Sequence, residues 1–269
     1  MASRSEANST FEEPNSGMLA DERRSLIMQA LASSGRVRVK DLVRQFNTTS
    51  VTIRNDLNEL QKRGLLVRSH GGAARPNSNQ YESPFQDRIQ THSEEKRRIG
   101  ILAASLIQDS EVVVLDSGTT THEIARQIKN RSRLQVITNG VNIANELLGA
   151  RVLTTILGGT LRTDSASIVG RTAEDMLSQL AADKLFMSGA GCDPEFGISG
   201  SNLEEAMLNK AMLRIARQVI LVADASKFDK RSMSRIASFS EVNIVISDVS
   251  MPVEVQERIR SFGCNLMLA

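Results

Sequence analysis

The sequence predicts an α/β protein in which an N-terminal winged helix-turn-helix precedes a largely parallel α/β domain. Residues 39–74 combine two short helical patterns, a glycine stop and a basic hairpin. After residue 96, continuous apolar runs alternate with helical patterns, as in a parallel sheet covered on both faces. Charge divides in the same way, because residues 36–75 carry a net +6 and residues 77–269 a net −2.

Two helices begin the first domain. We expect the first over residues 21–33, with Leu26, Ile27, Ala30 and Leu31 directed inward. The second has apolar residues at i, i+3, i+4 and i+7, which place one stripe on a short helix. The residues of that stripe are Val39, Leu42, Val43 and Phe46.

A third helix is predicted to begin near Ser50, because residues 47–50 are turn and N-cap formers. Ile53, Leu57 and Leu60 share its inner face. The opposite face and its flanks have the chemistry of a major-groove reader: arginine pairs with guanine, asparagine with adenine, and valine contacts a thymine methyl. These outward residues are Val51, Thr52, Arg54, Asn55, Asn58 and Lys62.

A basic hairpin follows Gly64 and predicts a wing. Residues 65–68 and 73–75 are joined across 69–72, whose glycines permit a tight turn. An ordinary helical hairpin with a solvated face is the alternative, but the basic wing and the charge count favour DNA binding. The predicted DNA-binding residues are Ser50, Val51, Thr52, Arg54, Asn55, Asn58, Lys62, Arg68 and His70.

The chain is expected to divide into a disordered tail at 1–17, a DNA-binding domain at 18–76, a linker at 77–95 and a second domain at 96–269. No run has the length of a membrane span, and no secretory segment is found. Cys192 and Cys264 lack metal-ligand or redox spacing. We therefore expect a cytoplasmic protein without a metal or a cofactor.

The second domain alternates strands with helices. Strands are predicted over 112–115, 135–138, 152–157, 184–188, 219–223, 242–246 and 265–268. Helices are predicted over 94–108, 121–129, 141–148, 173–181, 202–217 and 253–262.

A candidate ligand site follows the first of these strands, where ligands of open α/β sheets bind. It consists of Asp116, Ser117, Gly118, Thr119 and Thr120. Gly118 permits close backbone approach, the hydroxyls donate, and the start of a helix favours an anion. A phosphate cradle is the favoured interpretation, and a plain capped turn is the alternative.

Other residues are expected to converge on this rim. Asn139 and Glu205 can bind sugar hydroxyls, Lys210 and Lys227 can balance a phosphate, and Gly158 follows a further strand. For each lysine taken singly, a solvated surface role is the more common explanation. The position of Lys227 after a strand makes it the stronger candidate of the two.

These motifs resemble a known family. Residues 52–57 (TIRNDL), 64–68 (GLLVR) and 70–73 (HGGA) look like the N-terminal signature of the DeoR-type bacterial repressors of sugar metabolism. The resemblance runs from about residue 21 to the C-terminus. The chain departs from the family where Arg54-Asn55 replaces two arginines and where Thr48-Thr49 replaces Val-Ser, so its operator need not match that of a relative.

The second domain also resembles this family, through residues 116–120 (DSGTT), 138–140 (TNG), 158–159 (GG) and 226–228 (SKF). The resemblance implies a fold similar to phosphosugar isomerases and CoA transferases, with a phosphorylated sugar or amino sugar as the signal. Residues 115–121 with 54–56 are most similar to regulators of N-acetylgalactosamine and hexitol pathways.

The rival hypothesis is a phosphosugar isomerase-like enzyme with an accessory N-terminal module. Such an enzyme needs a positioned base, and the candidates are Asp116, His122, Glu205 and Asp224. Their spacing defines no acid/base pair, and a complete DNA-binding module has no purpose in an isomerase. An architectural DNA protein, in turn, would not need the second domain.

A repressor that reads a palindromic site must hold two recognition helices at a fixed spacing. We therefore expect a homo-oligomer, a dimer or tetramer, associated through the second domain. Operator duplex DNA and a phosphorylated sugar are the expected partners.

Overall fold

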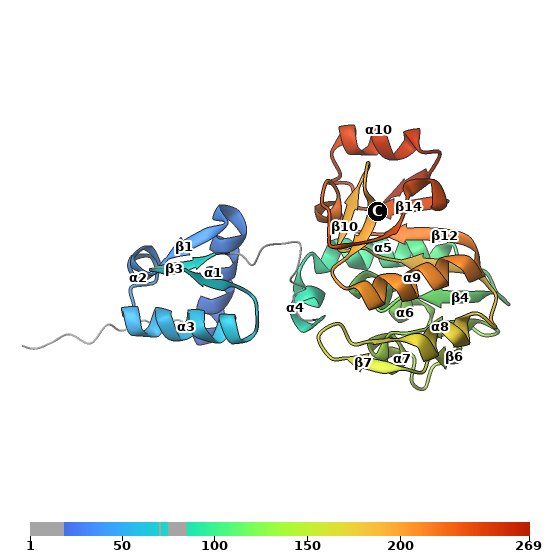
Figure 1. Ribbon diagram of the computed structural model, residues 1–269, viewed down its shortest axis with the longest axis horizontal. Coiled ribbons are helices and arrows are strands. Elements are labelled where there is room, and N and C mark those ends of the chain that lie inside the picture. The colour runs from blue at the N-terminus through green and yellow to red at the C-terminus, as the bar shows by residue number, and fades with distance from the viewer. Residues whose placement is uncertain (1–18, 70, 75–84) are drawn as a thin grey trace, which may run out of the picture. The chain divides into compact units, whose positions relative to one another are not determined.

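The computed structural model describes residues 19–69, 71–74 and 85–269. The chain divides into two compact units, Met1–Asn77 and Ser78–Ala269 (Figure 1). Each unit has its own hydrophobic core.

The first unit is a winged helix-turn-helix, as predicted. Its sheet has the order β1-β3-β2 with antiparallel pairs, so β2 and β3 form the wing. The first strand, β1, was not predicted, because an Arg-Val-Arg triplet carries no strand pattern. The elements are α1 (Ala20–Ser34), β1 (Arg36–Arg38), α2 (Val39–Phe46), α3 (Ser50–Lys62), β2 (Val67–Ser69) and β3 (Gly72–Ala74).

The core of this unit confirms the predicted inner faces of α2 and α3, but α1 is rotated relative to the expectation. Leu26 was expected inside and is 36% exposed, whereas Ile27 and Leu31 are buried. The buried stripe of α1 continues to Arg23, four residues before Ile27, instead of Leu26. A charged residue fits there because Asp56 of α3 pairs with it.

The second unit is built on a seven-stranded sheet in the order β15-β14-β12-β9-β4-β5-β6, and every neighbouring pair is parallel. This confirms the predicted parallel sheet. Its strands are β4 (Val112–Leu115), β5 (Gln135–Thr138), β6 (Leu153–Ile156), β9 (Ala182–Met187), β12 (Ala216–Val222), β14 (Ile244–Ser247) and β15 (Asn265–Leu268).

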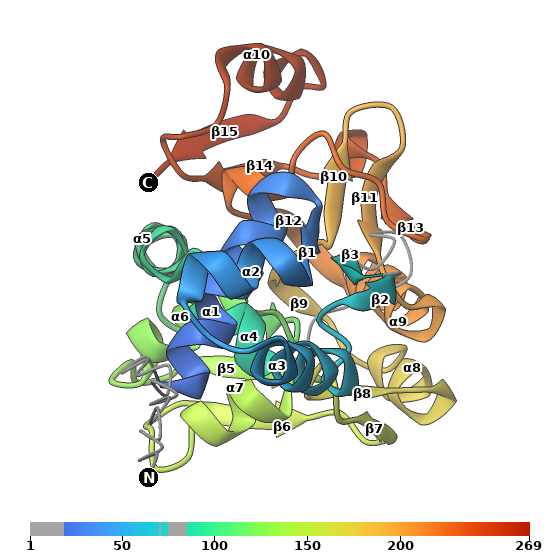
Figure 2. The same ribbon diagram turned by 90° about the vertical axis from the view of Figure 1, so that its left-hand side faces the viewer.

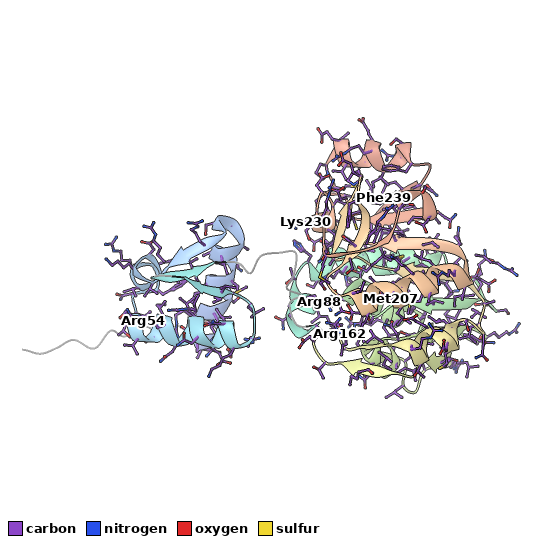
Figure 3. All side chains as sticks on the ribbon, viewed as in Figure 1. Arg54, Arg88, Arg162, Met207, Lys230 and Phe239 are labelled. Atoms are coloured by element: carbon purple, nitrogen blue, oxygen red, sulfur yellow. The ribbon has the colours of Figure 1, made fainter. Side chains whose placement is uncertain are left out.

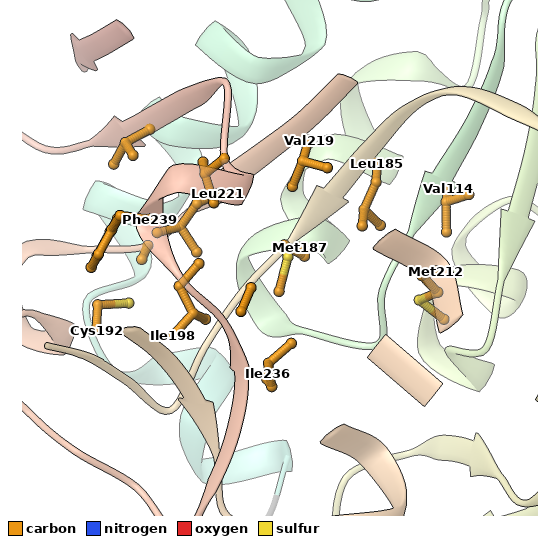
Figure 4. Close-up of a cluster of buried hydrophobic side chains, with 14 of the residues drawn as sticks. Val114, Leu185, Met187, Cys192, Ile198, Met212, Val219, Leu221, Ile236 and Phe239 are labelled. Atoms are coloured by element: carbon orange, nitrogen blue, oxygen red, sulfur yellow. The ribbon is translucent and has the colours of Figure 1, made fainter. Parts of the chain in front are cut away.

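Helices cover both faces of the sheet (Figure 2). Side chains alternate along each strand: Val113 and Leu115 pack against α5, α6 and α7, whereas Val114 packs on the side of α8, α9 and α10. The second of these cores contains Phe239 and Met187 (Figure 4). The helices are α5 (Ser93–Ser105), α6 (Thr119–Ile128), α7 (Val141–Glu146), α8 (Arg171–Leu177), α9 (Leu203–Ile215) and α10 (Val253–Ser261).

Helices α5 and α6 approach each other unusually closely at Gly100. A Cβ atom at this position would lie 2.6 Å from the Cβ of Glu123 on α6 and 2.9 Å from its backbone carbon. Only glycine fits this crossing without a shift of one helix.

Short antiparallel strands, which were not predicted, follow the carboxyl ends of β6, β9 and β12. β7 (Thr160–Arg162) pairs with β8 (Ser167–Val169), and β11 (Gly197–Gly200) lies between β10 (Gly191–Asp193) and β13 (Ser234–Ala237). Two single turns of 3₁₀ helix complete the unit, η1 (Ala225–Lys227) and η2 (Phe239–Glu241). These strands of three or four residues contain no continuous apolar run, so they leave no pattern in the sequence.

The expected linker at 77–95 is shorter than the sequence predicts. Residues Phe85–Gln90 form helix α4, and α5 already begins at Ser93. Phe85 is buried in the second unit, where its ring meets the edge of His122 at 6.1 Å between centroids. Six residues are too few for a helical period, so the pattern was missed. The remaining linker residues 77–84 and the predicted tail at 1–17 lie outside the described residues.

Candidate DNA-reading surface and ligand site

The reading helix α3 is fixed at its start by a side-chain cap. Thr49 accepts a hydrogen bond from the backbone amide of Thr52 at 3.1 Å, which satisfies one free donor of the first turn. Asn47 ends α2 in the left-handed region at φ 45°, so the turn between the two helices is tight. Ile53, Leu57 and Leu60 then anchor the helix in the core.

The opposite face of α3 is open to solvent. Ser50, Arg54, Asn55, Asn58 and Lys62 are exposed (Figure 3 labels Arg54), and Val51 is 62% exposed. Thr52 differs from the expectation, because it is half-buried and its hydroxyl lies 2.9 Å from that of Thr49. Thr52 thus supports the cap, while the other side chains present the groove-reading chemistry.

The wing carries Arg68 on β2. Its side chain is half-buried, and Nη1 is shielded from solvent with no hydrogen-bond partner among the described residues. Such a donor is available to an anion that reaches the wing. His70, the other predicted residue of the wing, lies outside the described residues.

In the second unit, Asp116 shapes the turn that follows β4. Its Oδ1 accepts from the amide of Gly118 at 2.7 Å, and its Oδ2 accepts from the amide of Ser188, after β9, at 2.8 Å. Burial raises the pKa of this carboxyl to about 6, against the lowering effect of these donors. Both oxygens accept backbone hydrogen bonds, so Asp116 holds two strand ends together.

The turn leads directly into the N-terminus of α6. Gly118 is the N-cap, and no side chain caps the helix among the described residues. The amides of its first turn have no intrahelical partner and bear partial positive charge. Thr119 and Thr120, predicted to lie in the loop, are buried residues of this first turn. The helix therefore offers backbone donors to an anion.

The end of β5 lies against this turn. A Cβ atom on Gly140 would lie 3.0 Å from the Cα of Ser117, so the two loops nearly touch. Asn139 is 1% exposed and donates from Nδ2 to the carbonyl of Ile168 at 3.2 Å. Its Oδ1 has no partner among the described residues. A buried unpaired acceptor costs free energy, which a ligand hydroxyl would offset.

A second unpaired acceptor follows β12. Asp224 is 1% exposed; its Oδ1 accepts from the amide of Ser226 at 3.1 Å, whereas Oδ2 has no described partner. Lys227, three residues later, is half-buried. Because only β9 separates β4 from β12, the ends of these two strands lie about 10 Å apart. Lys227 and the α6 terminus are therefore close enough to share one small ligand.

Lys96 lies close enough to Asp224 and Lys227 to feel their charges, and the sequence did not predict it as a site residue. Its Nζ donates to the carbonyls of Arg88 and Thr91, both at 2.6 Å, which closes the turn between α4 and α5. Burial lowers the pKa of Lys96 to about 8, and the charge of Asp224 opposes that shift. In the sequence Lys96 stands in a run of charged residues, which resembles a solvated helix face. No sequence signal distinguished it.

Glu205 is already engaged by protein side chains. Its Oε1 lies 2.8 Å from Nη1 of Arg162 on β7 and accepts hydrogen bonds from the hydroxyls of Ser165 and Ser167. The backbone of Ser167 also forms an isolated β-bridge with Gly140. Together these contacts hold the β7–β8 hairpin beside the end of β5. Figure 3 marks Arg162 in this hairpin. The three partners of Glu205 were not predicted, because they belong to the short β7–β8 hairpin and its turn.

Of the remaining expected residues, Gly158 lies on the same edge of the sheet, two strands from β4, whereas Lys210 lies elsewhere. Gly158 follows the edge strand β6, and its amide lies 3.5 Å from the sulfur of Met176 on α8. Lys210 is exposed and lines a different hollow with Ala216 and Asn243, which precede or begin strands. Since α9 runs antiparallel to the strands, each residue after Glu205 takes the helix 1.5 Å further from the ligand-binding edge. The sequence placed Lys210 too near that edge.

The candidate bases of the enzyme hypothesis form no acid/base pair. His122 lies 3.2 Å from Glu146 through Nε2 and packs on Phe85, and burial lowers the pKa of this imidazole. Asp116 and Glu205 hold loops together, as described above. The two units define a class of protein, a DNA-binding regulator whose second domain receives a small molecule.

Comparison with known proteins supplies the family. Residues 23–79 match the DeoR-like helix-turn-helix domain, and residues 91–249 match the DeoR C terminal sensor domain. The chain belongs to the DeoR family of transcriptional repressors, and it is not an enzyme.

Two relatives extend along nearly the whole chain. A protein of Escherichia coli O157:H7 named for repression of the aga operon is 38% identical and covers 92% of this chain and 93% of its own length. The glycerol-3-phosphate regulon repressor of Escherichia coli K12 is 34% identical and covers 89% and 95%. A ribose-5-phosphate isomerase solved with phospho-erythronic acid has a TM-score of 0.39 at 15% identity over 51% of this chain and 54% of its own, which says nothing about activity. Within the described ranges, no helix is both long and apolar enough to cross a membrane.

Proposed function

We propose that this chain represses a carbohydrate or amino-sugar catabolic operon and leaves its operator when a phosphorylated sugar binds at the carboxyl edge of the parallel sheet. Two of its relatives are named for the aga operon and for the glycerol-3-phosphate regulon. A repressor of this kind acts in the cytoplasm, where it has access to chromosomal DNA.

The ligand proposal rests on one observation: the same site contains hydrogen-bond donors and buried acceptors that have no described partner. The first-turn amides of α6 suit a phosphate, and Lys227 supplies a cation. The unpaired oxygens of Asn139 and Asp224 accept hydrogen bonds and cannot donate them. They therefore suit the hydroxyls or the amide N–H of a sugar. A simple inorganic anion would leave both acceptors unsatisfied.

On DNA, we propose that α3 reads bases through Arg54, Asn55 and Asn58, with Val51 against a thymine methyl. Ser50, Lys62 and Arg68 then contact the phosphate backbone. Two copies of α3 must reach successive major grooves, so the repressor acts as a homo-oligomer joined through the second unit. Ligand causes release only if it binds the low-affinity state more tightly.

The test begins with an operator selected from a random duplex pool with the full chain. Fluorescence anisotropy then follows release by a panel of hexose, hexosamine, N-acetylhexosamine and glycerol phosphates. We expect one of these to release the wild-type protein. Lys227→Ala and Asp224→Asn should bind the operator normally but need at least about tenfold more ligand, since each loses a charge-assisted or buried hydrogen bond.

Two controls separate the parts of the proposal. Lys210→Ala removes an exposed lysine outside the site and should respond like wild type. Arg54→Ala should lose affinity for the selected operator while it still binds the sugar phosphate in calorimetry. Unchanged ligand affinity in both site variants would contradict the site, and operator binding unaffected by Arg54→Ala would contradict the reading surface. Gly118→Val is unsuitable, because its Cβ would lie 2.9 Å from Asp116 Oδ1 and disturb the turn itself.

A further inference from the structure

A second hollow lies near the amino ends of β12 and β14, apart from the ligand site at their carboxyl ends. Its volume is about 700 Å³. This volume lies within the usual range for small-molecule sites. Helix α9, β12, β13 and the turn η2 contribute its walls. The lining consists of Lys210, Leu213, Arg214, Ala216, Arg217, Val219, Arg235, Ile236, Ala237, Glu241 and Asn243.

Four cationic side chains surround an apolar floor in this hollow. Lys210 and Arg214 lie one turn apart on α9, and Arg217 and Arg235 come from β12 and β13. The second domain has a net charge of −2, so this concentration of positive charge is local. With four cations against Glu241, the lining carries a net charge of +3.

The four cations make few ion pairs with the described residues of the chain. Within the described part of the chain, Lys210, Arg214 and Arg235 form no ion pair, and Arg217 has only a distant one with Asp183 at 3.7 Å. Glu241 is the only acid of the lining, and its Oε2 already accepts from the amide and hydroxyl of Ser238 at 2.8 and 2.9 Å. The carbonyl end of α9 offsets part of the positive charge.

We propose that this hollow binds a small molecule that carries two or more phosphate groups. Guanidinium groups pair with phosphate oxygens in a bidentate manner and also stack on planar rings, so three arginines suit a nucleoside polyphosphate. The floor of Val219, Ile236 and Ala237 provides the apolar surface for the rest of such a ligand. One monophosphate would leave most of the cations unpaired, which distinguishes this ligand class from a sugar monophosphate.

The test is calorimetry of the full chain with ATP, tripolyphosphate and inorganic phosphate. We expect ATP to bind more tightly than phosphate, and the double variant Arg214→Ser/Arg235→Ser to weaken ATP binding at least about tenfold. Arg151→Ser, an exposed arginine outside the lining, is the matched control. Lys227→Ala and Arg54→Ala should leave ATP affinity unchanged, because they lie in the sugar-phosphate site and the DNA-reading surface.

Other outcomes overturn the proposal. Suppose that tripolyphosphate bound as tightly as ATP and that Arg151→Ser weakened its binding as much as the double variant does. The charge of the surface alone would then be responsible. If Arg54→Ala abolished ATP binding, the ligand would occupy the DNA-binding unit. If the double variant lost affinity for duplex DNA but never bound ATP, the hollow would be a DNA contact. Thermal unfolding of each variant shows whether it is folded.

Discussion

Asp56 connects two helices of the DNA-binding unit through a buried ion pair. Its Oδ2 lies 2.6 Å from Nε of Arg23, and its Oδ1 lies 3.2 Å from Nε of Arg24, both on α1. Asp56 stands on the same helix as the groove-reading residues, one turn after Thr52. The orientation of α3 therefore depends on α1, which does not itself carry the predicted base-reading residues.

Asp56→Ala should lower the stability of the DNA-binding unit by about 3 kcal/mol, because it leaves a buried arginine without its carboxylate. Chemical denaturation followed by circular dichroism measures this loss. Arg24→Ala, which removes the more exposed partner, should cost much less. Equal and small losses in both variants would show that the pair contributes little to the fold.

Lys96 predicts a pH dependence of ligand binding. Its pKa is lowered to about 8, chiefly by burial. A phosphate placed near Lys227 would favour the charged ammonium and raise this pKa, so binding takes up a proton around pH 8. Affinity for the sugar phosphate should therefore fall as the pH rises through 8.

Calorimetry at pH 8 in two buffers of different ionisation enthalpy measures that proton uptake directly. Lys96→Met should remove it, whereas Lys210→Ala should not. Identical heats in the two buffers for the wild-type protein would show that Lys96 does not titrate on binding.

At the scale of elements, we expect α4 (Phe85–Gln90) to take part in transmitting ligand binding to the DNA-binding unit. It is the first described element after the DNA-binding unit, and it is fastened at both ends to structures around the ligand site. The amide of Phe85 donates to the carbonyl of Asp164 in the β7–β8 hairpin at 2.8 Å, and Lys96 holds the carbonyl of Arg88. A ligand that moves the hairpin or Lys96 thus changes how α4 is held.

Phe85→Ala should uncouple the two functions. It removes a buried ring at a cost of about 3 kcal/mol in the docking of α4. Operator affinity and sugar-phosphate affinity should both persist, while the extent of DNA release at saturating ligand should fall. The control is Phe262→Ala, which removes a partly exposed ring near the C-terminus. Full release by the Phe85 variant would exclude α4 as the connection.

Elements were predictable from sequence where their patterns were long enough. The seven parallel strands are mostly apolar runs separated by helical patterns, and their alternation along the chain and parallel pairing are confirmed. The short strands β7, β8, β10, β11 and β13 were missed because polar residues and glycines interrupt them, so they contain no continuous apolar run. The same limit affected the candidate site: Asn139 and Lys227 follow predicted strands and could be proposed from the sequence, whereas Arg162 and Ser167 belong to the hairpin that was missed.

At the scale of the whole molecule, self-association is expected to belong to the second unit. The sheet ends in unpaired edge strands, and on β6 Leu153 is 64% and Ile156 43% exposed. Exposed apolar residues on a sheet edge are typical of surfaces that another chain covers.

A fragment of residues 78–269 should therefore fold and sediment as a dimer or larger species at micromolar concentration. Leu153→Lys in this fragment should shift the distribution towards monomer if β6 is part of the interface. A fragment that remains monomeric at all concentrations would mean that DNA itself brings two chains together.

The contact at Gly100 has a consequence for the design of new sensors. Because α5 and α6 approach so closely there, a side chain at position 100 would displace one helix, and the pair extends from the α4 turn to the proposed anion site at the start of α6. In the proposed site, specificity is expected from the loops after β5 and β12, which carry Asn139 and Asp224. A biosensor for another sugar phosphate can therefore be sought by varying Asn139, Asp224 and their loop neighbours. The α5–α6 pair would be left unchanged in such variants.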